Sequence, residues 1–282
     1  MHSYVVRVPL ITLALALLAG AAPAQETDAG WPLAVRFRSY GDYNEATWTH
    51  LPRLGLGHVF MSVPAPEDVA ETQAKLAEHG LKPVVMRGDA DLSKDTFVEE
   101  ITPQLAICKK LDVKYMFLSA KRGESPKEVA YARLRAAGDA AKAHGVIIAM
   151  ETHPDLGTNG NVQLETMRAV NHPNVRVNFD TANITYYNKN TSAVAELAKI
   201  IDYVATIEFK DHSGEFETWD FPVLGQGVVD FPKIVRMLKD HGYQGPVTIE
   251  FEGTKGITLD ETEQKLAIAE SVAYARSLAQ FR

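Results

Sequence analysis

The sequence predicts an α/β protein built as a single closed barrel of eight parallel strands, each followed by a helix, the (β/α)8 fold. Three observations support this prediction. Four short apolar runs in the second half of the chain each end in an acidic residue. Segments with helical patterning separate these runs, as in repeated strand–helix units. Glycines stand where a helical pattern gives way to an apolar strand, which favours parallel strands over antiparallel ones.

Eight apolar segments are predicted to form the strands, because they are rich in Val, Ile, Met and Phe and alternate little before their carboxyl ends. They lie near residues 33–38, 58–63, 82–87, 113–119, 146–151, 175–180, 204–209 and 246–251. The last four end at or beside Glu151, Asp180, Glu208 and Glu250. In a barrel of this kind these acids meet at the carboxyl-terminal face, where active sites lie.

Start and stop signals define the helices. One helix is predicted to begin at Pro66 and to end before Gly80, a C-terminal cap. Ser125 is predicted to cap another, with Pro126 at its first position and Glu128 completing a capping box. Further helices are expected over 231–241 and 261–280.

Residues 1–24 are predicted to be a secretory signal peptide. Arg7 supplies a positive charge, residues 8–18 form a short apolar core, and Ala22-Pro23-Ala24 is a small-x-small cleavage pattern before Gln25. Cleavage leaves 282 − 24 = 258 residues for one domain, 25–282, close to the ~250 of one TIM barrel. We therefore expect an exported protein, periplasmic or secreted, with no membrane span after cleavage.

The composition argues against a nucleic-acid-binding protein. A net charge of −7 gives no electrostatic footprint for nucleic acid. With 46% hydrophobic residues the chain can bury a full core, and the single Cys108 is expected inside it. No glycine-rich phosphate loop is present, and the Gly225-x-Gly227 pattern is expected to shape a loop.

Several motifs resemble the sugar phosphate isomerases/epimerases, a family of xylose isomerase-like TIM barrels. They lie at 150–153, 178–183, 208–211, 223–231 and 248–252. The resemblance implies that a Glu, an Asp, a His and a second Glu hold one divalent cation, while the two Glu residues act as acid and base beside a carbonyl. By position, Glu151 and Glu250 match the glutamates and Asp180 matches the aspartate. Two positions depart from the pattern, because Glu208 and Asn183 stand where the family has histidine.

Two interpretations of the acidic residues therefore remain, one with a bound metal ion and one without. Glu151, Asp180, Glu208 and Glu250 are the predicted ligands, and converging carboxylates favour a hard cation such as Mn²⁺, Mg²⁺ or Ca²⁺ over zinc. Alternatively, Lys210 and Arg38 neutralise the acids in an ion-pair network without metal.

Other side chains have predicted roles at the barrel mouth. His153 could shuttle a proton, and Lys210 could bind a substrate oxyanion. His212 could face the mouth with Glu208 and Lys210 if the strand stays regular, and so replace the missing ligand. Arg38, His212 and Trp219 are candidate substrate contacts. Trp219 belongs with Phe216 and Phe221 to a loop that could form an aromatic wall for a sugar ring, whereas Glu252 is expected to be solvated.

The leading functional prediction is an exported carbohydrate enzyme that moves a proton α to the carbonyl of a non-phosphorylated sugar or keto-sugar, with metal assistance. A keto-glycoside lyase or dehydratase acting by β-elimination is one alternative, and a non-catalytic saccharide-binding barrel is another. A DNA-cleaving barrel would need a histidine cluster and a basic face, and neither is visible. Barrels of this family often pair, so a homo-oligomer is a further expectation.

Overall fold

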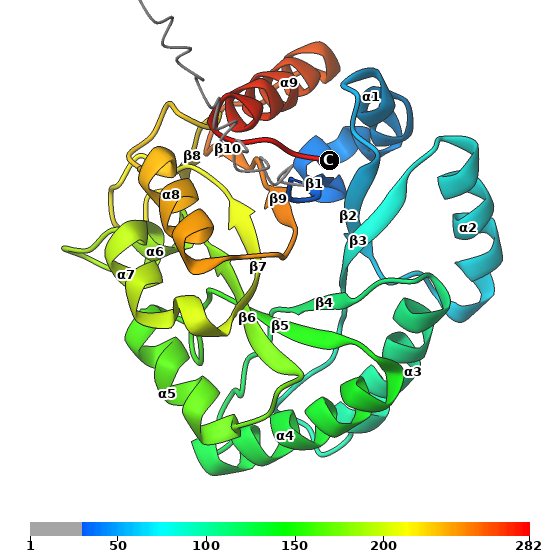
Figure 1. Cartoon of the computed structure of the whole chain (residues 1–282), viewed down its shortest axis with the longest axis vertical. Coiled ribbons are helices and arrows are strands. Elements are labelled where there is room, and N and C mark those ends of the chain that lie inside the picture. Colours follow the sequence, from blue (N-terminus) through cyan, green and yellow to red (C-terminus); the bar gives the residue numbers. More distant parts are fainter. Residues whose placement is uncertain (1–29) are drawn as a thin grey trace, which may run out of the picture.

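The computed structural model describes residues 30–282, which form the predicted closed parallel barrel (Figure 1). The predicted signal peptide and its cleavage point lie outside these residues. Each strand hydrogen-bonds in parallel to its two neighbours, and the eighth closes on the first. In barrel order the strands are β1 (Leu33–Arg36), β2 (His58–Ser62), β3 (Lys82–Arg87), β4 (Tyr115–Leu118), β5 (Ile147–Glu151), β6 (Val175–Asp180), β7 (Val204–Phe209) and β9 (Val247–Ile249).

Helices surround the barrel (Figure 1). They are α1 (Thr47–Arg53), α2 (Val69–Glu78), α3 (Phe97–Lys110), α4 (Lys127–His144), α5 (Gly160–Val170), α6 (Asn183–Tyr187), α7 (Ala193–Ile200), α8 (Phe231–His241) and α9 (Glu261–Leu278), with the 3-10 segments η1 (Phe37–Ala46), η2 (Pro66–Asp68) and η3 (Ile201–Tyr203).

The predicted start of one helix differs in detail. Ser125 does not cap α4, because its hydroxyl donates to the carbonyl of Ser93 instead, and the cap residue is Pro126 with no side-chain bond. The glycine stops are as expected: Gly80 and Gly145 have positive φ angles of 64° and 71°, a conformation that glycine adopts at little cost.

The apolar core has two parts. The larger part fills the space between strands and helices and includes Cys108, which is fully buried there. A small cluster of Phe60, Val85 and Phe117 is separate from it. Successive strand residues face opposite sides, so each strand contributes to two environments. The strands that end in acids bury polar side chains as well, including Asn178, Thr206 and Thr248. These polar side chains lie next to the acids at the strand ends.

A short antiparallel pair was not predicted. The strands β8 (Asp220–Phe221) and β10 (Gly253–Thr254) join the loop after β7 to the segment after β9. A hydrogen bond of 2.6 Å from the Thr254 hydroxyl to Asp220 ties them further. Two loops at the carboxyl-terminal face are thus held together.

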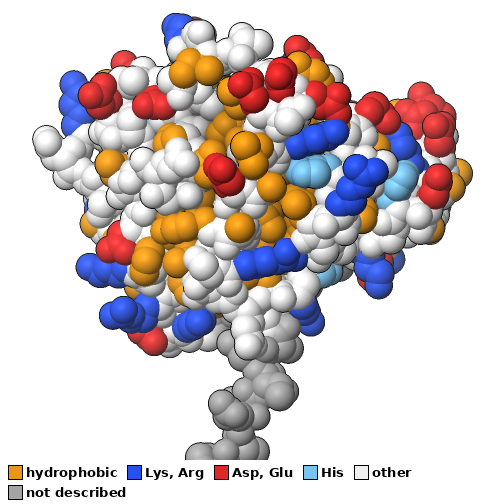
Figure 2. Space-filling model, turned by 90° about the horizontal axis from the view of Figure 1, so that it is seen from above, with side chains coloured by type: hydrophobic (Ala, Val, Ile, Leu, Met, Phe, Trp, Pro, Cys, Tyr) orange, Lys and Arg blue, Asp and Glu red, His pale blue; other side chains and the backbone are white. Residues whose placement is uncertain are grey.

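On the face drawn in Figure 2, apolar side chains gather across the middle, and both acidic and basic side chains lie around them. Within residues 30–282, no helix has the length and apolar character needed to cross a membrane.

Candidate active site

A cavity of about 510 Å³ opens at the carboxyl-terminal face of the barrel. Its lining is strongly charged. Acids come from the β5 and β9 side, basic side chains come from the carboxyl ends of β1, β3, β4 and β7, and most aromatic rings come from α6 and the β7–α8 loop. The lining residues are Arg36, Arg38, Gly41, Arg87, Ser119, Lys121, Glu151, His153, Asn183, Tyr186, Tyr187, Lys210, Trp219, Phe221, Glu250, Phe251, Glu252 and Gln264.

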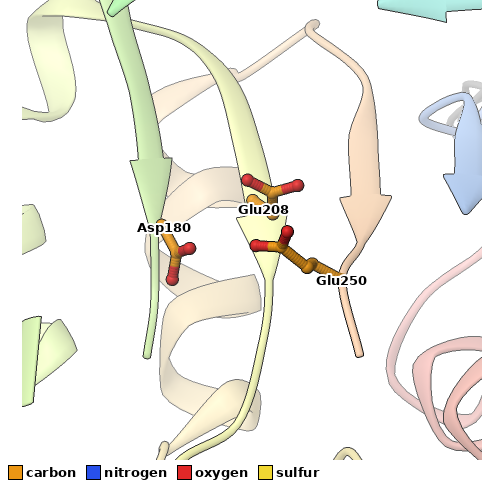
Figure 3. Close-up of side chains that lie close together, drawn as sticks. All are labelled: Asp180, Glu208 and Glu250. Carbon is orange, nitrogen blue, oxygen red and sulfur yellow. The ribbon is translucent and has the colours of Figure 1, made fainter. Parts of the chain in front are cut away.

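Three of the predicted acids converge beneath this cavity. Asp180, Glu208 and Glu250 each offer a carboxylate oxygen, and these oxygens lie within 4.8 Å of one another (Figure 3). Asp180 and Glu208 are fully buried, and Glu250 is 6% exposed. Only Glu250 of the three lines the cavity, so the other two lie under its floor.

Strand register explains this convergence. Asp180 pairs with Glu208, and Glu208 pairs with Thr248, which places these residues at one level of the barrel. Residues two positions further along a strand face the same side. Lys210 and Glu250 therefore lie together one level higher. Arg36 joins them, because Ala34 also pairs with Thr248.

The basic partner of the acids is Arg36, which the sequence analysis did not single out, and not Arg38. Arg36 Nη1 contacts Glu250 Oε1 directly and lies 3.4 Å from Glu208 Oε1. Its guanidinium carbon is 4.9 Å from the ring centres of both Phe60 and Phe117. Arg38 is exposed, lines the cavity and forms no ion pair with a described acid.

Lys210 is the second basic partner of the acids. Its Nζ lies 3.1 Å from Glu250 and 3.8 Å from Asp180, and it also contacts Glu252. Glu252 was expected to be solvated, but its side chain is only 28% exposed and lines the cavity. The contact with Lys210 Nζ holds the Glu252 carboxylate at the cavity.

This network moves the pKa values of its members apart. Burial raises the pKa of Glu250, but Arg36 and Lys210 outweigh it, so the pKa lies below its usual value. Burial, followed by the charge of Glu250, raises the pKa of Glu208 well above its usual value. Burial raises the pKa of Asp180 to about 7 against the opposing effect of Lys210. Of the three acids, Glu250 is therefore the one whose surroundings favour the ionised carboxylate at neutral pH.

Glu151 and His153 both line the cavity, as the sequence pattern predicted. Glu151 ends β5 and is half-buried, but it is not a member of the three-acid cluster. His153 Nδ1 is 2.6 Å from the carbonyl of Pro154 and must donate to it, since a carbonyl only accepts. In the neutral ring Nε2 is then the proton acceptor.

His212 lies elsewhere than predicted. The strand ends at Phe209, so the side-chain alternation does not continue to His212, which is fully buried and does not line the cavity. Its Nε2 donates to the Thr218 carbonyl at 2.9 Å. Its Nδ1 bonds the Thr185 hydroxyl at 2.8 Å. Both ring nitrogens are engaged, so His212 supports the loop and does not replace the missing ligand.

Asn183, the other departure from the family pattern, also takes a structural position. Its amide nitrogen donates to the Thr152 carbonyl at 2.9 Å, and its oxygen is 3.4 Å from Lys210 Nζ. Asn183 therefore joins the end of β5 to the lysine.

Aromatic side chains form one wall of the cavity. Trp219 is 41% exposed and lies edge-on to Phe221, with ring centres 5.2 Å apart. Phe216 does not line the cavity. Tyr186 and Tyr187 on α6 complete the wall and were missed, although their adjacent aromatic pair after the strand ending at Asp180 was a usable signal.

Opposite this wall, Arg38, Arg87 and Lys121 line the cavity. Within residues 30–282, none of these three side chains forms an ion pair. Burial, followed by the charges of Arg36 and Arg38, lowers the pKa of Arg87. This basic side of the cavity is thus available to a substrate.

The loop that carries Trp219 is anchored from behind. Asp211 accepts hydrogen bonds from the backbone amides of Gly225, Gly227 and Val229 at 2.9–3.2 Å. A Cβ at Gly227 would lie 2.3 Å from Asp211 Oδ1, so only glycine fits. The Gly-x-Gly pattern therefore shapes this loop, as expected.

Whether a metal suits the three acids depends on what already surrounds them. The carboxylates could hold a metal ion, and Asp180 Oδ2 is buried without a hydrogen-bond partner. However, Arg36 already contacts two of the acids and Lys210 contacts Asp180 and Glu250. The donor atoms suit a hard cation, but the space between them is shared with two cations of the chain. An ion fits only if Arg36 moves.

The fold and cavity define an α/β barrel with a charged, solvent-accessible site at its carboxyl-terminal face. The chain belongs to the xylose isomerase-like TIM barrel family, whose pattern matches residues 42–278. This match confirms the resemblance found in the sequence.

Solved structures share the fold. The xylose isomerase domain protein from Planctomyces limnophilus is 21% identical, with a TM-score of 0.70 over 88% of this chain and 97% of that one. D-psicose 3-epimerase from Clostridium cellulolyticum H10, solved with D-tagatose, is 17% identical, with a TM-score of 0.71 over 88% and 99%. The IolI protein with a bound zinc atom is 19% identical, with a TM-score of 0.68 over 86% and 97%. No curated protein sequence matches the chain.

Proposed function

We propose that the protein is an enzyme of the isomerase or epimerase type, which moves a proton on the carbon next to the carbonyl of a carbohydrate. The observation that carries this proposal is the pairing of Glu151 and Glu250 in one cavity. Glu250 is held as a carboxylate by Arg36 and Lys210. A carboxylate that touches substrate is the usual base for such a proton, and a second acid can return it.

The roles follow from position and charge. One glutamate takes the proton, the electron pair moves toward the carbonyl oxygen to give an enediolate, and the other glutamate returns a proton. Glu151 comes from β5 and Glu250 from the end of β9, with two strands between them around the barrel, so they approach the substrate from different directions. His153 Nε2 can accept a hydroxyl proton, and the ammonium of Lys210 lies beside Glu250 to balance developing negative charge.

We propose a sugar or keto-sugar without phosphate as the substrate. Aromatic rings such as Trp219 and Phe221 offer the flat apolar surface that sugar rings stack on. The related epimerase solved with D-tagatose supports a ketose. The unpaired basic side chains make acidic sugars, such as uronates, a necessary part of any substrate panel.

Three further features of the proposal concern the whole protein. We propose that residues 1–24 direct export to the periplasm or medium, and mass spectrometry of the mature amino terminus tests for cleavage before Gln25. Any divalent ion that enters the cluster would be Mn²⁺, Mg²⁺ or Ca²⁺, because every donor is oxygen. Pairing into a homo-oligomer stays a prediction, and sedimentation velocity tests it.

A substrate panel tests the function. Residues 25–282 are incubated with aldoses, ketoses, keto-glycosides and uronates, and products are identified by NMR. We expect Glu151→Gln and Glu250→Gln to lower turnover by about 10²–10⁴-fold while binding persists. Glu78→Gln, an exposed acid on α2, is the matched control and should change nothing.

Two outcomes would contradict the proposal. An unsaturated product would indicate the lyase or dehydratase reaction by β-elimination. Saturable calorimetric binding without product, unchanged in Glu151→Gln, would indicate a saccharide-binding barrel without catalysis.

A further inference from the structure

Each acid of the three-acid cluster already has a cationic side chain of the protein beside it. Arg36 bridges Glu208 and Glu250, while Lys210 bridges Glu250 and Asp180. Every carboxylate of the cluster therefore has a cation of the protein within 4 Å. The second oxygen of Glu208 accepts from Asn178 at 3.3 Å. Two strands supply these cations, and the barrel register fixes both of them beside the acids.

Arg36 is held in this position by more than charge. The side chain is 6% exposed. Its guanidinium lies 4.9 Å from the ring centres of both Phe60 and Phe117. Stacking on aromatic faces suits guanidinium, which is planar and weakly hydrated. Because Arg36 ends β1, its backbone is also fixed by strand pairing. Leaving the acids would cost the side chain both its ion pairs and its aromatic neighbours.

We propose that the guanidinium of Arg36 is a built-in cation that takes the place of a divalent ion at Asp180, Glu208 and Glu250. A divalent ion bound to these oxygens would meet Arg36 at contact distance and Lys210 close by. Like charges a few ångströms apart in a buried site repel strongly. Arginine does not lose its proton at any ordinary pH, so it cannot give way by neutralising.

The acid in place of the family's histidine agrees with this proposal. An imidazole at position 208 would be a neutral metal ligand, whereas the carboxyl group of Glu208 accepts a hydrogen bond of 3.4 Å from Arg36 Nη1. Glu208 and Arg36 thus form a matched pair on neighbouring levels of the barrel. The inference concerns ion binding alone and holds whether or not the proposed reaction is found.

The test is direct binding of Mn²⁺ to the mature chain, measured by calorimetry and by electron paramagnetic resonance of free Mn²⁺. Elemental mass spectrometry of the purified protein gives its resident metal. We expect the unaltered protein to carry well under one equivalent and to bind Mn²⁺ weakly. Arg36→Met, which keeps the apolar stem and removes the charge, should bind one equivalent at least a hundredfold more tightly.

Three further variants give the comparison. Arg38→Met removes a cavity charge that has no contact with the cluster and should bind no more Mn²⁺ than the unaltered protein. Arg36→Lys keeps a positive charge and should also exclude the ion. In Arg36→Met/Asp180→Asn the gained affinity should be lost, which would assign it to the cluster.

One equivalent of Mn²⁺ bound at micromolar affinity by the unaltered protein would overturn the proposal, as would equal affinity in Arg36→Met. The first result needs no variant, so the proposal stays testable even where Arg36→Met fails to fold. Absence of turnover on every sugar would contradict the proposed function but leave these ion-binding results as they stand.

Discussion

Removing Lys210 perturbs the site most, because one ammonium serves three acids. In Lys210→Met the apolar stem remains, while Asp180, Glu250 and Glu252 lose their shared cation. We expect a large loss of stability at pH 8 that becomes smaller as the pH falls. The size of this loss shows whether the ion pairs of Lys210 stabilise the fold as buried pairs do or contribute as little as surface pairs.

The magnitude follows from the distances. Nζ lies 3.1 Å from Glu250 and 3.8 Å from Asp180, and at an effective dielectric constant of about 20 each attraction is about 4–5 kcal/mol before desolvation. Breaking a buried pair by removing one partner costs about 3–5 kcal/mol. We therefore expect the free energy of unfolding at pH 8 to fall by about that amount.

The pH dependence has a definite sign. Without Lys210 the pKa values of the freed acids rise in the folded state, so these acids take up protons as the pH falls and the uncompensated charge disappears. A raised folded-state pKa gives stability that is present at low pH and lost as the pH rises. The cost of the substitution should therefore be smaller at pH 5 than at pH 8.

Urea unfolding followed by tryptophan fluorescence at the two pH values measures this effect. Lys94→Met is the matched control, because Lys94 is 59% exposed and, among residues 30–282, pairs only with Asp91 at 3.5 Å. Little change is expected. A Lys210→Met cost below about 1 kcal/mol at both pH values would refute the reasoning, since buried pairs lose more than this.

Three more predictions concern single side chains. Burial raises the pKa of Asp180 to about 7 from 3.8. The folded protein therefore loses stability as the pH rises through about 7, because Asp180 must then ionise while buried. In Asp180→Asn this fall in the free energy of unfolding between pH 4 and 8 should be smaller by up to about 4 kcal/mol. Gly227→Ala places a Cβ 2.3 Å from Asp211 Oδ1 and should cost about 1–3 kcal/mol in thermal unfolding. Trp219→Ala should raise the KM about 2–10-fold with little change in kcat, by loss of a stacking surface.

The Gly227→Ala and Trp219→Ala predictions each have a control within the chain. Gly57→Ala meets no atom within 4 Å and should leave the melting temperature unchanged. Phe216→Ala removes an exposed ring outside the cavity and should leave the KM unchanged. Equal pH profiles for the Asp180→Asn and unaltered proteins, an equally stable Gly227→Ala, or an unchanged KM in Trp219→Ala would contradict the respective prediction.

The barrel and its acids were predictable because both depend on local pattern. Apolar runs that end in carboxylates mark strand ends at the functional face, so Glu151, Asp180, Glu208 and Glu250 were found from sequence alone. Period-two alternation also places Lys210 on the side of Glu208. These features need no knowledge of how strands are paired.

What the sequence did not reveal depends on register and on where a strand stops. Arg36 and Arg38 are two residues apart, so alternation along a strand would place both on the same side. Only the pairing of Ala34 with Thr248 identifies Arg36 as the partner of Glu250. His212 lies past the end of its strand, where alternation no longer applies, and its ring bonds the Thr185 hydroxyl on α6 and the carbonyl of Thr218 in its own loop. Strand pairing decided the first case, and the end of β7 at Phe209 decided the second.

Solvent exchange during turnover tests the central claim most directly. The protein is incubated in D₂O with the substrate found in the panel, and product and remaining substrate are examined by NMR. The account predicts deuterium at the carbon next to the carbonyl, and loss of this incorporation in Glu151→Gln and Glu250→Gln. Product formed at full rate without solvent deuterium at that carbon, or incorporation unchanged in both variants, would contradict proton transfer by these glutamates.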